Sequence, residues 1–203
     1  LSTPFQEMGE NLFFEDIEGN AFIDLFSFRL SHIKEDDRDV FWKKHIDNAS
    51  ESPLVHVRFN RLVLIAKGIA KSGCRDHYVT DITSLLEQEI SKIRDRRLKV
   101  WANQDLCEVY ILFGHASQAQ ALALSLEKGR PRVQRSSLKG VIGLLLSQNE
   151  YENSVELAGK IRRVKDRIPA LLDIAEKYIE VEMIQESQEQ VNALLRVLDT
   201  PKD

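Results

Sequence analysis

The sequence has few of the residues that interrupt helices or cross-link chains. Its 203 residues include five prolines, nine glycines and two cysteines. Because proline and glycine are the strongest breakers of regular structure, long helices are possible over most of the chain. Cys74 and Cys107 cannot form a disulfide framework, and each is interpreted as a small buried thiol within a helix. This cysteine usage is typical of a reducing compartment, so we expect a cytoplasmic protein.

Long apolar runs are also missing. A helix needs about 20 apolar residues to span a bilayer, and the longest near-continuous apolar stretch is Val141–Leu146. The first residues, Leu1–Pro4, lack the basic start and apolar stretch of a secretory signal. We therefore expect no membrane partner.

Recognisable catalytic and metal-binding motifs are absent from the sequence. Cys74 and His77 supply too few ligands for zinc, which usually takes four. There is no phosphate-cradling glycine loop, no G-x-S-x-G and no H-E-x-x-H. The sequence thus predicts a protein that is not an enzyme and needs no cofactor. A regulatory helical domain of an all-α enzyme is the alternative.

Charge is unevenly distributed along the chain. The net charge is −4, yet residues 1–51 carry 12 acidic and 5 basic side chains, whereas residues 52–203 carry 20 acidic and 23 basic ones. Such a split indicates two modules with different surfaces. An isoelectric point near 5.8 also lacks the basic footprint of most nucleic-acid-binding domains.

What the sequence does contain is a repeated helical stripe. Apolar or small residues recur at offsets 0, 3, 4, 7 and 8, which form one face of an α-helix. The four copies begin at Leu62, Asn103, Leu138 and Leu171. Gly73, Gly114 and Asn149 stand at offset 11 of the first three copies. Glycine at this position is a helix stop signal, because it adopts the left-handed conformation without steric cost.

Each copy continues into a second predicted helix. Offsets 16, 20 and 23 hold Tyr78, Ile82 and Leu85, then Ala119, Ala123 and Leu126, then Ser154, Ala158 and Ile161, then Ser187, Val191 and Leu194. The copies start 41, 35 and 33 residues apart. The longer first spacing predicts a longer second helix in that copy, over about residues 78–99.

This pattern resembles the tetratricopeptide repeat, a helix–turn–helix unit with the signature W-x2-L-G-x2-Y, then A-x3-F, then P. The second copy matches best, through Leu106, Cys107, Tyr110, Gly114, Ala119, Ala123, Leu126 and Pro131. The signature tryptophan is replaced in all four copies, as is the glycine. The resemblance implies an all-α fold of antiparallel helical hairpins, stacked as a short right-handed α-solenoid. Its four degenerate repeats would span about residues 58–99, 100–134, 135–167 and 168–200. An irregular helical bundle is the alternative.

Residues 1–57 do not follow the repeat and predict an acidic helical module. A helical stripe of Phe22, Ile23, Phe26, Leu30 and Ile33 follows Gly19-Asn20, which is interpreted as a start signal. Val40, Phe41, Lys44 and Ile46 indicate a second helix before the turn at residues 50–53, and an earlier helix is suggested by Phe5, Met8, Leu12, Phe13 and Ile17. The end of a repeat stack needs a cover, so capping is the expected role. A patch that binds an aromatic-recognising partner is the alternative.

The first helices of stacked hairpins line a concave surface, which in similar proteins binds a peptide or helix of a partner. Spacing then implies that the partner-binding residues are Lys67, Gln104, Glu108, Lys139 and Glu176, together with Val63, Gly143 and Leu172. These positions fall between those of the apolar stripe, so the stacking core does not need them. The alternative is that they simply face solvent.

Fifteen of the 28 basic residues lie in three short clusters, one at each junction between predicted repeats. In a stack these junctions share one edge, so the clusters predict a basic ridge. Its site residues would be Arg94, Arg97, Arg130, Arg132, Arg162 and Arg163. Such a ridge suits an acidic protein partner, phosphate groups or nucleic acid. The structural alternative is that cations near helix C-termini are favoured by about 0.3–1 kcal/mol each.

Nucleic acid is the least favoured of these partners, because no aromatic residues interleave the basic clusters as base stacking would require. The acidic N-terminal module could also fold against the ridge. The sequence thus predicts an interaction scaffold or adaptor that binds a protein or peptide partner, an acidic one at the basic edge. It leaves the oligomeric state open.

Overall fold

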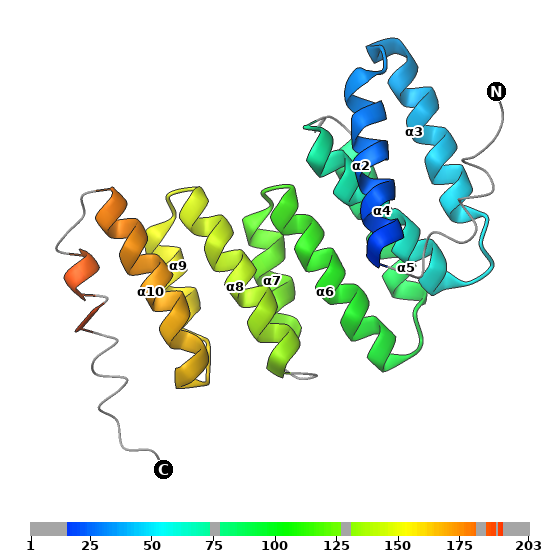
Figure 1. Ribbon diagram of the computed structural model, residues 1–203. Helices are drawn as coiled ribbons and strands as arrows, with labels where there is room; N and C mark the ends of the chain where they lie inside the picture. The colour runs from blue at the N-terminus through cyan, green and yellow to red at the C-terminus, as the bar shows by residue number, and fades with distance from the viewer. Residues whose placement is uncertain (1–15, 74–77, 127–130, 182–185, 190, 193–203) are drawn as a thin grey trace. The chain divides into compact units, whose positions relative to one another are not determined.

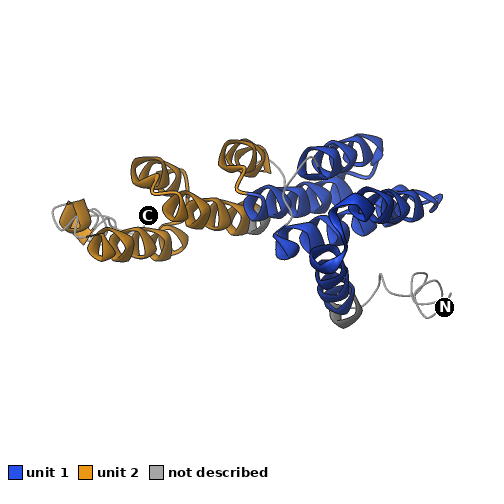
Figure 2. Cartoon of the chain, turned by 90° about the horizontal axis from the view of Figure 1, so that it is seen from above, with its two compact units in different colours: residues 1–113 blue, residues 114–203 orange. Residues whose placement is uncertain are grey.

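The computed structural model describes residues 16–73, 78–126, 131–181, 186–189 and 191–192. Every regular element within these ranges is a helix, as the sequence predicts. None of the described helices is both long enough and apolar enough to cross a bilayer. The chain divides into two compact units, residues 1–113 (unit 1) and 114–203 (unit 2), coloured separately in Figure 2. The predicted boundary at residue 57 falls inside unit 1 and stays a prediction.

Unit 1 is organised around one central helix. Its helices are α2 (Asp16–His32), α3 (Glu35–Ser50), α4 (Val55–Ser72), α5 (Tyr78–Lys92) and α6 (Arg96–Leu112). Helix α4 packs against all four of the others, and α5 also packs against α6 (Figure 1). The side chains of Phe59, Leu62, Ile65 and Ile69 on α4 are almost completely buried. One amphipathic helix therefore supplies much of the core of this unit.

Helix α2 packs closely on α4 because α4 has a glycine at the point of contact. A Cβ atom on Gly68 would lie only 2.5 Å from Cδ1 of Phe26, whose side chain is 2% exposed. One turn further along α4, Lys71 Nζ lies 2.5 Å from Asp24 Oδ1 of α2. The α2–α4 contact thus combines a buried ring on a glycine with an exposed ion pair.

Aromatic side chains of both α2 and α5 contact helix α3. Trp42 and Tyr78 of α5 have ring centroids 5.2 Å apart, and the Tyr78 hydroxyl donates to Asp39 Oδ1 at 2.6 Å. On the other side, His45 packs against Phe26, with centroids 5.0 Å apart. Burial, with the nearby charges of Lys44 and Arg29, lowers the pKa of His45 to about 4. The ring is therefore neutral at pH 7.

Unit 2 places small side chains in the core on its two short helices. Its helices are α7 (Ala116–Ser125), α8 (Pro131–Ser147), α9 (Tyr151–Gly159) and α10 (Val164–Glu180). Helix α8 packs against α7, α9 and α10, and α9 also packs against α10 (Figure 1). On the two short helices, Ala119, Ala123, Ser154 and Ala158 are each 0% exposed. Small residues at these positions allow neighbouring helices to approach closely.

The predicted stripes are confirmed as the core. Ile65, Leu106, Val141 and Ile174, one from each copy, are between 0% and 4% exposed. The turns also fall where the sequence places them, because Gly73, Gly114 and Asn149 have φ angles of 74°, 79° and 61°. The fourth copy departs from its stripe, since Ile179 is 59% and Val191 is 42% exposed.

Some sequence predictions are wrong. The long helix over residues 78–99 is two helices, because the Asp95 carboxylate accepts hydrogen bonds from the backbone N–H groups of Arg97 and Leu98 and thereby starts α6. Gly19-Asn20 does not start a helix but lies inside α2. At offset 23 of the first copy Leu85 is only partly buried, and its neighbour Leu86 fills the core instead. The earlier helix predicted from Phe5 to Ile17 falls largely outside the described residues.

Candidate functional site

Three predicted partner-binding residues lie together on unit 1. Lys67 of α4 and Glu108 of α6 form an ion pair, with Nζ and Oε2 3.1 Å apart. Gln104 stands one turn before Glu108 on α6, and its Oε1 atom is buried without a hydrogen-bond partner among the described residues. Val63 behaves differently from expectation: it is 6% exposed and belongs to the core. The open face is therefore formed by Lys67 and its neighbours on α6.

Sequence reasoning missed Asp105, which belongs to this same face. Burial raises its pKa to about 6, although the nearby Lys67 opposes the shift, and the Glu108 carboxylate raises it further. The face thus holds one partly buried carboxyl group and one accessible ion pair. Groups of this kind can hydrogen-bond a peptide backbone or a polar side chain.

The other predicted partner-binding residues lie on unit 2. Lys139 and Gly143 of α8, and Leu172 and Glu176 of α10, are all exposed, and these two helices pack against each other. The side chain of Leu172 is 46% exposed. They form an uncovered face of mixed character on unit 2.

The described members of the basic ridge are exposed. They are Arg94, Arg97, Arg162 and Arg163, whereas Arg130 and the side chain of Arg132 lie outside the described residues. Helix dipoles do not account for Arg97 and Arg163, because Arg97 lies in the first turn of α6 and Arg163 caps the N-terminus of α10. A cation is unfavourable at the N-terminus of a helix. The explanation of the ridge by helix dipoles is therefore weaker at these two positions.

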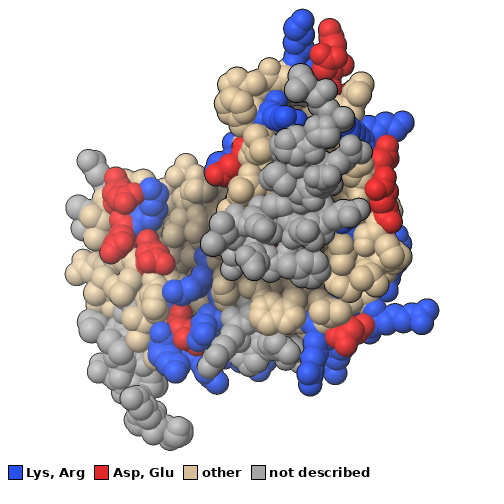
Figure 3. Space-filling model, turned by 45° about the vertical axis from the view of Figure 1, so that its right-hand side comes forward, with Lys and Arg blue, Asp and Glu red and all other residues tan. Residues whose placement is uncertain are grey.

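Other members of the basic clusters have structural partners. Arg135 lies 2.6 Å from Asp166, and Arg167 donates two hydrogen bonds to the Ile161 carbonyl, at 2.9 and 2.7 Å. Lys92 pairs with Glu89, which Arg58 also contacts. Acidic side chains consequently lie among the basic ones on the face drawn in Figure 3.

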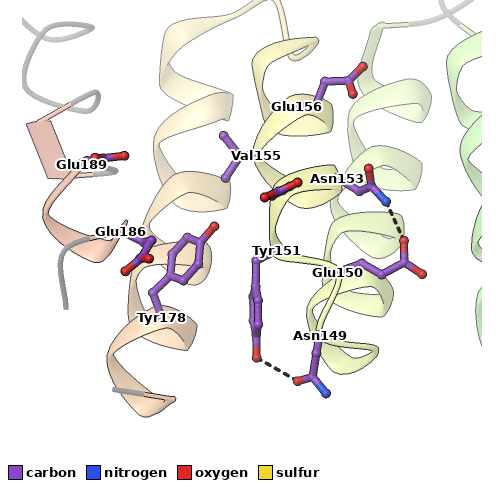
Figure 4. A pocket seen from close by; sticks show the side chains of 10 residues that line it. Asn149, Glu150, Tyr151, Asn153, Val155, Glu156, Tyr178, Glu186 and Glu189 are labelled. Atoms are coloured by element: carbon purple, nitrogen blue, oxygen red, sulfur yellow. Dashed lines mark hydrogen bonds between the residues drawn. The ribbon is translucent and has the colours of Figure 1, made fainter. Parts of the chain in front are cut away.

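A pocket that the sequence did not predict lies within unit 2 (Figure 4). It has a volume of about 660 Å³ and is bounded by the turn before α9, by α9 and α10, and by residues 186–189. Tyr151 and Tyr178 form part of its wall, with ring centroids 5.1 Å apart. Its acidic residues are Glu150, Glu152, Glu156, Glu186 and Glu189. The pocket is therefore both aromatic and strongly acidic.

The side chains of the pocket differ in how they are satisfied. Asn153 donates to Glu150 at 2.7 Å, and Glu156 pairs with Lys160 at 2.7 Å. Glu152, Glu186 and Glu189 have no basic partner among the described residues. Burial raises the pKa of Tyr178, and the nearby carboxylates raise it further. Its hydroxyl therefore stays protonated at neutral pH.

Metal ligands do not converge in the part of the chain that the structure describes. No group of three or more His, Cys, Asp or Glu side chains there could hold a metal ion. Cys74 and His77 fall outside the described residues, and Cys107 is a buried thiol within α6.

Comparison with known proteins adds no relative. The chain matches no protein-family model, no curated protein and no solved structure. The resemblance to the tetratricopeptide repeat therefore rests on the spacing of residues in the sequence.

Proposed function

We propose that this protein is an interaction module built from stacked helical hairpins, which binds a segment of a partner protein on the uncovered faces of its first helices. In this arrangement the first helices of the four hairpins are α4, α6, α8 and α10. The N-terminal helices α2 and α3 would cap the stack. The proposal assigns no catalytic role to the chain.

The observation that carries the proposal is the pattern of helix contacts, which is the same in both units. In unit 1, α4 packs against α6, and α5 packs against both; in unit 2, α8 packs against α10, and α9 packs against both. Stacked hairpins have this pattern, because each second helix lies between two successive first helices. The non-core side of the first helices is then left to face a ligand.

The chemistry of the α4–α6 face supports a peptide-like ligand. Glu108 and Lys67 are accessible, with 53% and 27% of their side chains exposed. The accessible Glu108 carboxylate can accept a hydrogen bond from a backbone N–H group. An extended segment offers such donors at regular intervals. The exposed Arg97 and Arg163 would add affinity for an acidic part of the partner.

Selection of binding peptides tests the proposal. Purified full-length protein would be presented with a library of displayed random peptides, and the affinities of the selected peptides would be measured. The double variant Lys67→Glu/Glu108→Lys keeps an ion pair but reverses its direction. We expect it to fold normally and to bind the selected peptides about tenfold more weakly, the usual scale for an altered charged contact.

A matched variant controls for changes in surface charge. Lys43→Glu/Asp47→Lys exchanges two exposed charges one turn apart on α3, and it should leave peptide affinity unchanged. If no peptide is selected, or if the two double variants bind equally well, the assignment of the α4–α6 face is wrong.

A further inference from the structure

The pocket of unit 2 contains a tyrosine hydroxyl that has no hydrogen-bond partner among the described residues. The Tyr178 side chain is 4% exposed, and its hydroxyl makes no hydrogen bond with any residue that the structure describes. Figure 4 shows its ring extending from α10 into the space between α9 and α10, with the hydroxyl directed toward Val155. Because the ring is held in the core while its hydroxyl faces the pocket, a ligand that enters the pocket can form a hydrogen bond with it.

The equivalent tyrosine in unit 1 shows what this hydroxyl lacks. Tyr110 also stands at offset 7 of its copy, and its hydroxyl donates to Glu87 of the neighbouring helix α5. Tyrosine at this step of the repeat is thus compatible with a fully satisfied hydroxyl. No described side chain plays the part of Glu87 for Tyr178, and its hydroxyl faces the pocket instead.

The charge of the pocket selects the kind of ligand. The dipole of α9 accounts for Glu152 in its first turn, and Lys160 neutralises Glu156. Neither explanation applies to Glu186 and Glu189, which have no basic partner among the described residues. An anion would be repelled here, whereas an ammonium or guanidinium group would be attracted.

The aromatic wall fits the same ligand. The two tyrosine rings offer faces that attract cations, and the volume of about 660 Å³ lies within the range of 300–1,000 Å³ for ligand pockets. The stem of a long basic side chain can pack on the rings while its charged end reaches the carboxylates. The described residues also place no set of three metal ligands here, so a bare metal ion fits the site less well.

We propose that this pocket binds a lysine or arginine side chain from a basic segment of a partner protein, with the Tyr178 hydroxyl accepting a hydrogen bond from the cationic group. Glu186 and Glu189 provide the complementary charge. This inference rests on the proposed function, because it treats the ligand as part of a protein. It adds a second docking point that favours a basic segment, in contrast to the basic edge.

Fluorescence anisotropy with the full chain tests the pocket. The probe is a fluorescein-labelled octapeptide that alternates glycine with lysine, and the control probe has glutamate in place of lysine. At about 0.15 M salt, where exposed charges are well screened, we expect saturable binding of the lysine peptide alone. Tyr178→Phe retains the ring but removes the hydroxyl, and should weaken binding about tenfold, as for the loss of a hydrogen bond to a charged group.

Two double variants with the same change in net charge separate the pocket from general attraction to an acidic protein. Glu186→Gln/Glu189→Gln should weaken binding about tenfold, whereas Asp47→Asn/Glu51→Gln, at exposed positions near the end of α3, should change it less than twofold. Thermal unfolding would verify that each variant is folded. Equal losses in both double variants, or binding that Tyr178→Phe leaves unchanged, would overturn the proposal.

Further outcomes distinguish this inference from the proposed function. Spermidine offers ammonium groups without a peptide backbone, so tighter binding of spermidine than of the lysine peptide would replace the partner segment with a free polyamine. Selected peptides that bind well, lack basic residues and are unaffected by Tyr178→Phe would preserve the proposed function and remove the pocket. If instead the lysine peptide binds through Tyr178, while the Lys67/Glu108 exchange leaves the affinity of the selected peptides unchanged, the pocket would be preserved and the assignment of the α4–α6 face removed.

Discussion

In unit 1 an aromatic side chain and a polar contact attach the additional helix α3, whereas the two short helices of unit 2 carry small side chains into the core. The difference is sharpest at offset 16 of the repeat. Tyr78 occupies it in the first copy, where it contacts both Trp42 and Asp39 of α3. Ala119 and Ser154 occupy it in the next two copies and are completely buried. One repeat position can therefore either anchor an additional helix or allow two helices to pack closely.

One polar residue from each unit illustrates a second difference, which concerns hydrogen-bond partners. In unit 1, Glu89 is 8% exposed and contacts both Arg58 and Lys92. Burial alone would raise its pKa, but the hydrogen bonds from Lys92 and Arg58 outweigh burial and lower it. In unit 2, the Tyr178 side chain is 4% exposed, and its hydroxyl has no such partner among the described residues. Glu89 is thus satisfied within its own unit, whereas the Tyr178 hydroxyl is left available to a ligand.

The largest expected effect comes from changing side-chain size at offset 20. Ile82→Ala in unit 1 should lower the free energy of unfolding by about 3 kcal/mol, because it leaves a cavity at a fully buried site. Ala158→Leu in unit 2 should lower it by about 2 kcal/mol, because the added atoms have no space. Denaturant unfolding gives the magnitudes, and hydrogen exchange read by mass spectrometry assigns each loss to a unit.

Two conservative changes serve as controls for this comparison. Ile82→Leu keeps the volume and should cost less than about 1.5 kcal/mol. Gly159→Ala adds a carbon atom beside Ala158 where no atom lies within 4 Å, so it should be close to neutral. If Ala158→Leu were as harmless as Gly159→Ala, close packing would not be what unit 2 depends on.

A smaller effect, with opposite signs in the two units, is expected for two glycines in the middle of helices. Alanine is favoured over glycine within a helix by roughly 0.5–1 kcal/mol. Gly143→Ala on α8 should therefore stabilise the protein by about that amount, because its added Cβ meets no atom within 4 Å. Gly68→Ala on α4 should instead destabilise by about 1 kcal/mol, because the Cβ collides with the ring of Phe26.

The Phe26 ring is itself the control for the glycine comparison. In a Phe26→Ala background the collision is removed, and Gly68→Ala should become stabilising, as at Gly143. Thermal unfolding of the unchanged chain, the two single variants and the double variant completes a double-mutant cycle. A penalty for Gly68→Ala that persists in that background would show that α2 does not determine the need for glycine.

The smallest expected effect is the net pH dependence of stability in the unchanged chain, because two groups of unit 1 act in opposite directions and partly cancel. The pKa of His45 is about 4 in the folded state and 6.5 in the reference state, so its contribution to stability is present above pH 6.5 and is lost as the pH falls toward 4. Asp105, with a pKa of about 6 against 3.8, acts in the opposite direction: its contribution is present below pH 3.8 and is lost as the pH rises through 6.

Removing either group should reveal the pH dependence of stability that the other group causes between pH 7 and pH 5. Asp105→Asn should steepen the loss of stability on acidification, and His45→Phe should reverse it, by roughly 1–2 kcal/mol in each case. Urea unfolding at both pH values measures the change. Parallel pH profiles for both variants and the unchanged chain would contradict the assignment.

The elements of the fold could largely be predicted because they follow from short-range patterns. A stripe at offsets 3, 4, 7 and 8 needs only helix geometry, and Gly73 and Gly114 end helices for reasons of local sterics. The break before α6 was also predictable in principle, because an aspartate such as Asp95 favours the N-terminus of a helix. The 41-residue spacing suggested one longer helix and concealed that signal.

The contacts that define the candidate sites could not be predicted in the same way. The approach of Phe26 to Gly68 joins residues 42 positions apart, and no local pattern encodes it. The pocket needs residues 186–189 to lie beside Tyr178 and Tyr151. One signal was available, because a tyrosine at a core position must find a partner for its hydroxyl. The Lys67–Glu108 pair was anticipated only as two positions that share a face.

The role of Tyr78 means that the hairpins of this protein are not interchangeable parts. If a copy of the α8–α9 hairpin replaced α4–α5, Ser154 would stand where Tyr78 packs against Trp42, and α3 would lose both that ring and the hydrogen bond to Asp39. Duplications or shuffling of hairpins would be tolerated more readily among copies with small residues at this step. The place of the first hairpin beside α3 thus depends on one aromatic side chain.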